Sequence, residues 1–300
     1  MKIADIHTHT ALCKHAEGEP EEYLAAALAL GESYYGVADH CPFPAGFEPE
    51  WRMDESEFPQ YRQIIRDLRA QAAGTGLTVL YGMEMDWVPG RRAEVEAKLA
   101  AEPLDYIIGS IHCVDGFCFD DPDKRSLWDE PGMAEKIWRG YVRDLKTYVS
   151  EWNFQILGHA DLPKKFGYKP VYTPEFERAF REIFGIMKER GMALEINVAG
   201  LHNAVAEIYP SQRLLALAKE SGLTLTYGSD AHSPAMVGRD FSAAVAWAKQ
   251  AGFNAFSVFV QKRQILLPFD CAASAAIRRR SMLQSTCRKK ASQKSTLPCQ

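Results

Sequence analysis

Two histidines near the start of the sequence stand two residues apart, in the run Asp5-Ile6-His7-Thr8-His9. The run closes a predicted strand, and residues two apart on a strand point to the same face. His7 and His9 can therefore aim both imidazoles at one metal ion, and imidazole is a common ligand of Zn²⁺. A pair of surface histidines is the alternative, and the motif alone favours the two interpretations about equally.

Residues of the same types recur after the other predicted strands. Taken singly, each is more often a structural or exposed residue than a ligand. However, six predicted strand ends carry them, and catalytic groups of parallel α/β barrels gather at the C-terminal ends of the strands. The sequence therefore predicts a metal site. The nine candidate ligands are His7, His9, His15, His40, Glu84, His112, His159, Asp230 and His232.

Short β-rich runs alternate with longer helical stretches, which indicates parallel strands joined by crossover helices and thus an α/β fold. Strands are predicted over residues 3–7, 34–38, 78–83, 106–111, 154–157, 193–197, 223–227 and 255–260. Helices are predicted over residues 20–30, 58–73, 92–101, 133–150, 174–190 and 211–220.

The bulk composition of the 300 residues suits one large soluble domain, with 47% hydrophobic and 25% charged residues. A net charge of −4 argues against nucleic-acid binding through bulk electrostatics. We find no secretory signal and no run that could span a bilayer, so a cytoplasmic protein without a membrane partner is expected. The seven cysteines form no CxxC pair, and we interpret them as reduced thiols.

The end of the sequence differs in composition from the rest. From Pro268 onward it holds seven Lys and Arg residues against one acid, Asp270, and it has no hydrophobic period. We therefore divide the chain into a barrel domain over residues 1–267 and a basic, disordered or weakly ordered tail over residues 268–300.

Nine ligands are too many for one ion and suit two or three ions that share a bridging carboxylate. Mixed imidazole and carboxylate ligands favour Zn²⁺, Mn²⁺ or Fe²⁺. Ions about 4 Å apart lower the pKa of a bridging water and hold the attacking and leaving oxygens of a phosphoryl transfer. The chemistry expected here is hydrolysis of a small phosphate ester.

The order of these motifs resembles the PHP (polymerase and histidinol phosphatase) family, and within it the histidinol-phosphatase branch. The similarity runs from residue 1 to about 267. It rests on the nine ligand positions and on Asp39-His40-Cys41-Pro42-Phe43-Pro44, Trp51-Arg52-Met53, the stretch Gly158-His159-Ala160-Asp161-Leu162-Pro163-Lys164-Lys165-Phe166-Gly167, and Glu195-Ile196-Asn197.

The resemblance implies a distorted (β/α)7 TIM-like barrel with a metal centre at the C-terminal strand ends. It also implies hydrolysis of L-histidinol phosphate to L-histidinol and phosphate in histidine biosynthesis, through attack by a metal-bridging hydroxide. Carried over, one metal takes His7, His9, Glu84 and Asp230; a second takes Glu84, His112 and His159; the third takes His15, His40 and His232.

Other residues are expected to support the reaction. Asp39 and Asp161 are predicted to orient histidine ligands, and Arg52, Lys164 and Lys165 to hold the phosphate or orient the substrate. The branch usually places an arginine after Gly-Leu at the position where this chain has His202. A histidine can donate to phosphate, but near neutral pH it is a weaker anion clamp than a guanidinium.

The sequence leaves four alternatives to weigh. The chain can be a PHP phosphodiesterase or exonuclease, or a phosphatase acting on another small phosphate ester. An amidohydrolase also begins with an HxH strand, but Glu84 and the pairing of Asp230 with His232 fit PHP proteins better. A non-catalytic PHP module would have lost ligands, and none is lost here. The oligomeric state is not predicted.

Overall fold

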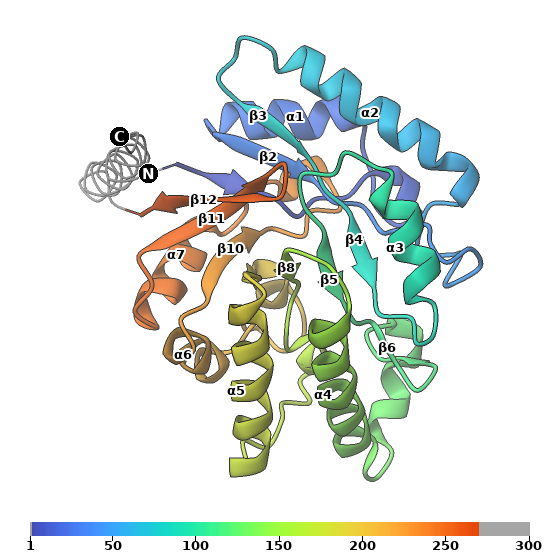
Figure 1. The fold of residues 1–300 in the computed structure, drawn as a ribbon, viewed down its shortest axis with the longest axis vertical. Helices are drawn as coiled ribbons and strands as arrows, with labels where there is room; N and C mark the ends of the chain where they lie inside the picture. The colour runs from blue at the N-terminus through green and yellow to red at the C-terminus, as the bar shows by residue number, and fades with distance from the viewer. Residues whose placement is uncertain (1, 270–300) are drawn as a thin grey trace, which may run out of the picture.

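The structure is a computed structural model that describes residues 2–269. Eight of its strands form two parallel sheets, and the helices lie around the strands (Figure 1). Two antiparallel pairs, β6 Cys113–Val114 with β7 Phe117–Cys118 and β11 Ala255–Val260 with β12 Arg263–Pro268, stand outside these sheets. One sheet has the order β1-β2-β3, with β1 Ala4–Asp5, β2 Tyr34–Val37 and β3 Thr78–Tyr81. The other has the order β10-β9-β8-β5-β4, with β4 Glu84–Asp86, β5 Ile108–Ser110, β8 Ile156–Leu157, β9 Ala193–Asn197 and β10 Thr224–Gly228.

The two sheets are joined at two places, one beyond the C-terminal ends of β1 and β10 and the other between the extension of β2 and the start of β4. On one side an isolated bridge joins Thr8 to Ala231, and His9 N donates to Ala231 O at 2.9 Å. On the other side a bridge joins His40 to Glu84, and Glu84 N donates to Asp39 O at 3.0 Å. The bridging segments are the same ones that carry the candidate ligands, so sheet pairing brings those side chains together.

The predicted strand over residues 78–83 ends early, as β3, at Tyr81; the chain bends at Gly82, and a strand that was not predicted, β4, begins at Glu84. The Tyr106 ring is fully buried beside this bend, and a Cβ on Gly82 would come within 2.4 Å of it. The hydroxyl of Tyr106 donates to Ile6 O at 2.6 Å. The glycine thus admits a tyrosine that ties β1 to the bend, and the bend re-aims the segment that begins at Glu84.

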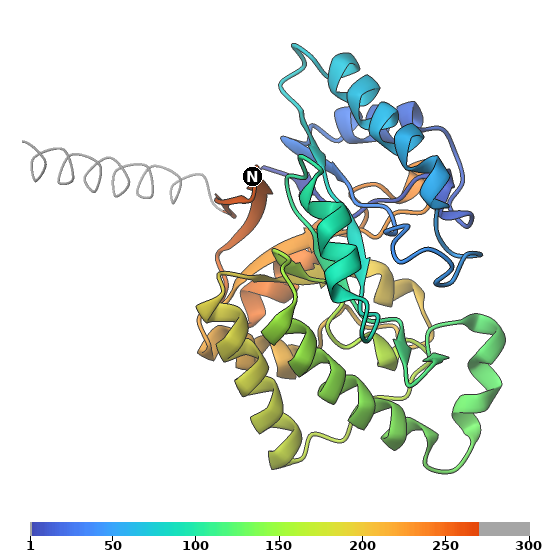
Figure 2. The same ribbon diagram turned by 45° about the vertical axis from the view of Figure 1, so that its right-hand side comes forward.

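Seven helices are described, and they cover the outside of the strands (Figures 1 and 2). Local capping explains several of their starts: Thr173 Oγ1 accepts from Phe176 N at the start of α5, and Ser211 Oγ accepts from Leu214 N at the start of α6. They are α1 Pro20–Ala29, α2 Phe58–Gln71, α3 Arg92–Ala100, α4 Met133–Glu151, α5 Pro174–Glu189, α6 Gln212–Glu220 and α7 Phe241–Gln250. The first six agree closely with the predicted helices, and α7 has no predicted counterpart.

The chain ends in a hairpin within the described residues. β11 (Ala255–Val260) pairs antiparallel with β12 (Arg263–Pro268), so the last predicted strand does not join a parallel sheet. Phe269 is buried against the ring of Phe256, with centroids 4.8 Å apart. The packed domain therefore continues through Phe269, two residues past the predicted boundary, and the remainder of the predicted tail lies outside the described residues.

Within residues 2–269, no helix has both the length and the apolar character needed to cross a membrane.

Glu32, just before β2, is a buried acid whose protonation can be tested. Its side chain is buried, and both carboxyl oxygens lack a hydrogen-bond partner in the described part of the chain. Burial, with a contribution from Asp5, raises the pKa of Glu32 well above its ordinary value of 4.5. The folded protein therefore favours the protonated acid, and its stability falls as pH rises from that ordinary value through the raised pKa.

We expect Glu32→Gln to raise the free energy of unfolding at pH 8 by about 1–3 kcal/mol, because the buried unpartnered charge is removed. The gain should shrink toward pH 4.5. Urea unfolding followed by circular dichroism at both pH values measures it, with the exposed Glu50→Gln as the matched control. A variant no more stable than the wild type at pH 8 would contradict this account.

Candidate metal centre

The imidazoles of His7 and His9 are both buried and are each held through one ring nitrogen. His7 Nδ1 lies 2.6 Å from Glu195 Oε1, and His9 Nδ1 lies 3.4 Å from Asp39 Oδ1. Their Nε2 atoms face the same carboxylate, at 3.8 and 3.2 Å from Asp230 Oδ1. Strand alternation therefore presents two nitrogen lone pairs to one point.

Glu84 lies at the centre of the cluster and is fully buried. Its Oε1 is 3.0 Å from His159 Nε2 and its Oε2 is 3.0 Å from His40 Nδ1. Burial would raise the pKa of Glu84, but His40 and His7 hold it well below its ordinary value. One carboxylate thus has five imidazole nitrogens within 4 Å, which belong to His7, His9, His40, His112 and His159.

A second group of imidazoles packs ring against ring. His9 and His232 have centroids 4.1 Å apart, His15 and His232 4.6 Å, and His15 and His40 5.4 Å. Burial lowers the pKa of His15 to about 4, with His40 and His9 adding to the effect. His15 Nδ1 lies 2.8 Å from Cys13 O, and His232 Nδ1 lies 3.0 Å from Asp230 O. Each ring can donate to its carbonyl from Nδ1, so Nε2 is left as an acceptor.

The unsatisfied atoms of the cluster fit a divalent cation. Buried ring nitrogens and a carboxylate oxygen have no hydrogen-bond partner among residues 2–269: His7 Nε2, His9 Nε2, His40 Nδ1, His232 Nε2 and Glu84 Oε2. Buried polar atoms left unpaired cost free energy, which a metal ion would remove. Several sets of three ligand atoms lie within 4.8 Å of one another, namely His7 with His9 and Asp230, His40 with Glu84 and His112, and His9 with His40 and His232.

Protons compete with a cation for two of these ligands. Although burial opposes their charge, Asp230 and Asp39 raise the pKa of His9 to about 9, and Asp86 and Glu84 raise that of His112 to about 10. A metal ion must displace such a proton, so binding would release protons.

Two supporting carboxylates have no role in the sequence-based prediction. Glu195 Oε1 holds His7, and its Oε2 accepts from the backbone N–H of His159 at 2.8 Å. Asp86 Oδ1 lies 2.5 Å from His112 Nδ1, and its Oδ2 accepts from Arg52 Nη1 at 2.7 Å. Each sits in a fully buried strand. Each is a charged residue in a predicted strand or just beyond its end, and this signal could have marked both carboxylates as candidates.

Asp39 lies where an orienting residue should, because it touches His9 and accepts from Thr10 N at 3.2 Å. Asp161 and Lys164 do not occupy the positions predicted for them. Asp161 accepts from Ser211 N at 2.8 Å and pairs with Lys164 Nζ at 3.0 Å. Lys164 is fully buried and also donates to Ile208 O. The 3-10 turn over Leu162–Lys164 directs this amine inward, where it neutralises a buried carboxylate rather than facing substrate.

The ligands open onto a cavity of about 440 Å³ that Arg52, Lys165 and His202 also line. Arg52 Nη2 donates to Glu48 Oε2 at 2.9 Å in addition to its bond with Asp86, so it mainly supports His112. Lys165 Nζ donates to Asp120 O at 2.8 Å. His202 Nε2 lies 2.7 Å from Asp240 Oδ2.

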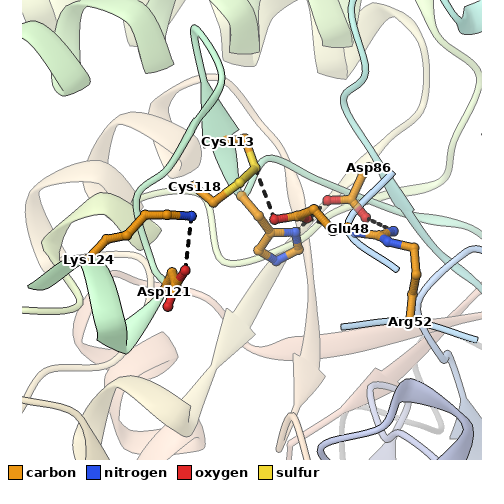
Figure 3. Close-up of a disulfide and its surroundings, with 8 residues drawn as sticks. Glu48, Arg52, Asp86, Cys113, Cys118, Asp121 and Lys124 are labelled. Carbon is orange, nitrogen blue, oxygen red and sulfur yellow. Dashed lines mark hydrogen bonds and ion pairs between the residues drawn. A yellow bond between two sulfur atoms is a disulfide. The ribbon is translucent and has the colours of Figure 1, made fainter. Parts of the chain in front are cut away.

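A disulfide joins Cys113 to Cys118 immediately after His112 (Figure 3). The prediction that all cysteines are reduced is therefore wrong for this pair; Cys13 and Cys41 are free and buried, and the other three lie outside the described residues. The cause is a tight hairpin whose Asp115-Gly116 turn has two positive φ angles, so Cys113 and Cys118 stand directly opposite each other. The bonded Cys113 Sγ packs 3.2 Å from Glu48 Oε1.

We expect Glu195→Gln to weaken metal retention roughly 10- to 100-fold, because an amide holds the His7 ring less firmly in its ligating orientation than a carboxylate does. Metal analysis after dialysis against graded chelator concentrations measures the change. The exposed Glu189→Gln is the matched control. Retention equal to that of the wild type would mean that Glu195 does not orient a ligand.

The disulfide predicts a specific alkylation pattern. Under denaturing, non-reducing conditions Cys13 and Cys41 should react with iodoacetamide, whereas Cys113 and Cys118 should react only after reduction. Peptide mass spectrometry separates the two cases. Alkylation of Cys113 without a reductant would rule out the bond in the isolated protein.

The comparisons with known proteins all indicate the same family. The model of the PHP domain family matches residues 5–199. A protein of Deinococcus radiodurans named "Probable histidinol-phosphatase" is 36% identical over 253 residues, which span 83% of this chain and 94% of that protein. The histidinol-phosphatase of Bacillus subtilis is 26% identical over 267 residues, spanning 81% of this chain and 98% of that one.

A solved structure has the same fold. The crystal structure of histidinol phosphate phosphatase from Lactococcus lactis, complexed with zinc, L-histidinol and phosphate, superposes with a TM-score of 0.73 at 23% identity. The superposition covers 88% of this chain and 99% of that one. Since the family model matches more than half of the chain and the Deinococcus relative matches most of it, this protein belongs to the PHP family.

Proposed function

We propose that the protein is a histidinol-phosphatase, a metal-dependent phosphoric monoester hydrolase that converts L-histidinol phosphate to L-histidinol and phosphate. The observation that carries the proposal is the convergence of the nine candidate ligands on one cluster, with unpaired ring nitrogens facing the buried carboxylate of Glu84. Seven of the nine line the cavity, and His7 and His9 lie behind it against Glu84. The choice of substrate rests on the similarity to named histidinol-phosphatases over most of the chain.

We propose that the two sheets close into a seven-stranded (β/α)7 barrel, in which β3 and β4 count as one bent strand. The site lies at the C-terminal ends of the barrel strands. The bridges between Thr8 and Ala231 and between His40 and Glu84 support this closure. A separate buried cluster formed mainly by strand residues, among them Ile6, Ile108 and Val258, supports a barrel interior beneath the ligands.

We assign up to three divalent ions to the cluster. The first would be held by His7, His9, Glu84 and Asp230, the second by Glu84, His112 and His159, and the third by His15, His40 and His232. The close ligand atoms of His7, His9 and Asp230 support the first group. The set of His40, Glu84 and His112 and the set of His9, His40 and His232 each join residues of two groups, which fits ions that lie side by side. The mixture of imidazole and carboxylate favours Zn²⁺, Mn²⁺ or Fe²⁺.

When bound, the ions would lower the pKa of a water that attacks phosphorus and would neutralise the phosphoryl oxygens. The chain's own residues prepare the site for this. Asp39, Asp86 and Glu195 each hold the Nδ1 of one histidine, so that its Nε2 faces Glu84. Glu84 sets a negative charge between the imidazole groups, and Lys165 adds a positive charge at the cavity wall.

We expect the metal-loaded protein to release phosphate from L-histidinol phosphate in preference to other phosphate monoesters and to a dinucleotide. His112→Ala should lower kcat/KM by roughly a hundredfold or more, because it removes a ligand beside Glu84. The exposed Arg139→Gln is the control and should retain the wild-type rate.

The outcomes separate the alternatives that remain after the family assignment. Activity restricted to other monoesters would contradict the substrate but keep the phosphatase. Activity restricted to the dinucleotide would instead indicate a phosphodiesterase. Absence of activity after loading with Zn²⁺, Mn²⁺ and Fe²⁺ in turn would contradict the catalytic proposal.

A further inference from the structure

The cationic side chains that line the cavity differ in how their charge is used. Arg52 is paired with Asp86, Lys165 with Asp120, and His202 with Asp240, at 2.7, 3.5 and 2.7 Å. Arg239 also lines the cavity. Among residues 2–269 no carboxylate oxygen lies within 4.0 Å of its guanidinium, whose contacts are with a backbone carbonyl. It is therefore the cavity cation whose charge is not already offset by a neighbouring acid.

The Arg239 guanidinium is held in a fixed orientation. Its Nε and Nη2 donate to Ser229 O at 3.1 and 3.0 Å, which occupies one edge of the fork. Its backbone is anchored as well, because Tyr227 OH donates to Arg239 O and Gly238 N donates to Asp5 Oδ2 at 2.8 Å. A pre-positioned guanidinium loses little conformational entropy when it binds an anion. Ser229 directly precedes the candidate ligand Asp230, so this cation is tied to the metal-binding segment itself.

His202 is poorly arranged to hold an anion. Its Nε2 lies 2.7 Å from Asp240 Oδ2, so the Nε2–H group donates a hydrogen bond to that carboxylate. Only Nδ1 of the ring is left for a second contact, and the Asp240 carboxylate beside the ring repels a phosphate oxygen. The residue that stands where the histidinol-phosphatase branch usually has an arginine is thus already engaged in the wall of the cavity.

We propose that Arg239 takes over this role and holds the phosphoryl group of the substrate beside the metal centre. Guanidinium groups bind phosphate oxygens through directed, charge-assisted hydrogen bonds. Arg239 Nη1 is the donor assigned to this contact. The inference rests on the proposed function for the identity of the substrate, but anion binding by Arg239 can be measured without any turnover.

The test uses the zinc-loaded full chain and inorganic phosphate as the probe. We expect Arg239→Gln to raise the Kd for phosphate, measured by isothermal titration calorimetry, about 10- to 100-fold, the usual value of a charge-assisted hydrogen bond. KM for L-histidinol phosphate should rise in parallel. Arg239→Lys should recover part of the affinity. His202→Gln, and Arg213→Gln on the exposed face of α6, should change the Kd by less than about twofold.

Metal content and thermal unfolding are measured on the same samples, because Arg239 also braces Ser229. Loss of phosphate affinity at unchanged metal content supports the proposal. An unchanged Kd in Arg239→Gln overturns it, as does a larger loss in His202→Gln. Equal losses of zinc in the Gln and Lys variants would also overturn it, since they would show a purely structural role. Failure to hydrolyse L-histidinol phosphate, with the phosphate results intact, would reject the substrate but not Arg239.

Discussion

The site depends on the buried carboxylate of Glu84, which lies at the centre of the imidazole cluster. A lone carboxylate without solvent is too costly to persist, so its surroundings must supply positive charge or hydrogen bonds. Here the surroundings are imidazoles from several strand ends, with His159 and His40 each 3.0 Å away. The bend at Gly82 and the bridge between His40 and Glu84 place the carboxylate where these strand ends converge. The packing of Tyr106 behind the bend is thus part of the construction of the site, although Tyr106 is not among the nine candidate ligands.

The histidines differ in what holds their second nitrogen. His7, His9 and His112 are held by carboxylates, which make the ring a stronger base; the pKa values of about 9 and 10 for His9 and His112 reflect this. His15 and His232 are held by carbonyl oxygens instead, and burial, together with neighbouring imidazoles, lowers the pKa of both rings, that of His15 to about 4. Strongly basic ligands donate more charge to a metal but compete with protons for it, whereas neutral ligands have no proton to lose. One cluster therefore contains two electrostatic environments for cations.

Much of this arrangement follows from local sequence signals. The alternation of β-rich and helical runs predicts six helices, and β9 and β11 span the residues predicted for them. The direction in which each side chain points is harder to predict from the sequence. Lys164 and Lys165 are neighbours with the same charge, yet one is fully buried against Asp161 and the other lines the cavity, because a short 3-10 turn separates their directions. The partners of His7 and His112 lie 188 and 26 residues away. A charged residue in a buried strand marks Glu195 and Asp86 as unusual, but no local pattern shows which histidine each one supports. The hairpin at Asp115-Gly116 carried a readable turn signal, but the pairing of its two cysteines depends on register.

The segment after β10 positions a candidate metal ligand and a cavity cation. The sequence motif Ser229-Asp230-Ala231-His232 indicates only the first of these. Asp230 and Asp240 both adopt positive φ, of 55° and 54°, which aspartate tolerates better than most residues. The first turn aims a carboxylate at His7 and His9, and the second brings a carboxylate onto His202. Between them Arg239 returns to bond the carbonyl of Ser229. The segment thereby couples the position of a metal-facing acid to that of a cation with no acidic partner among the described residues, so a substitution in either turn would disturb both. One backbone segment, from Ser229 to Asp240, therefore positions both the metal-facing carboxylate of Asp230 and the guanidinium that we assign to phosphate binding.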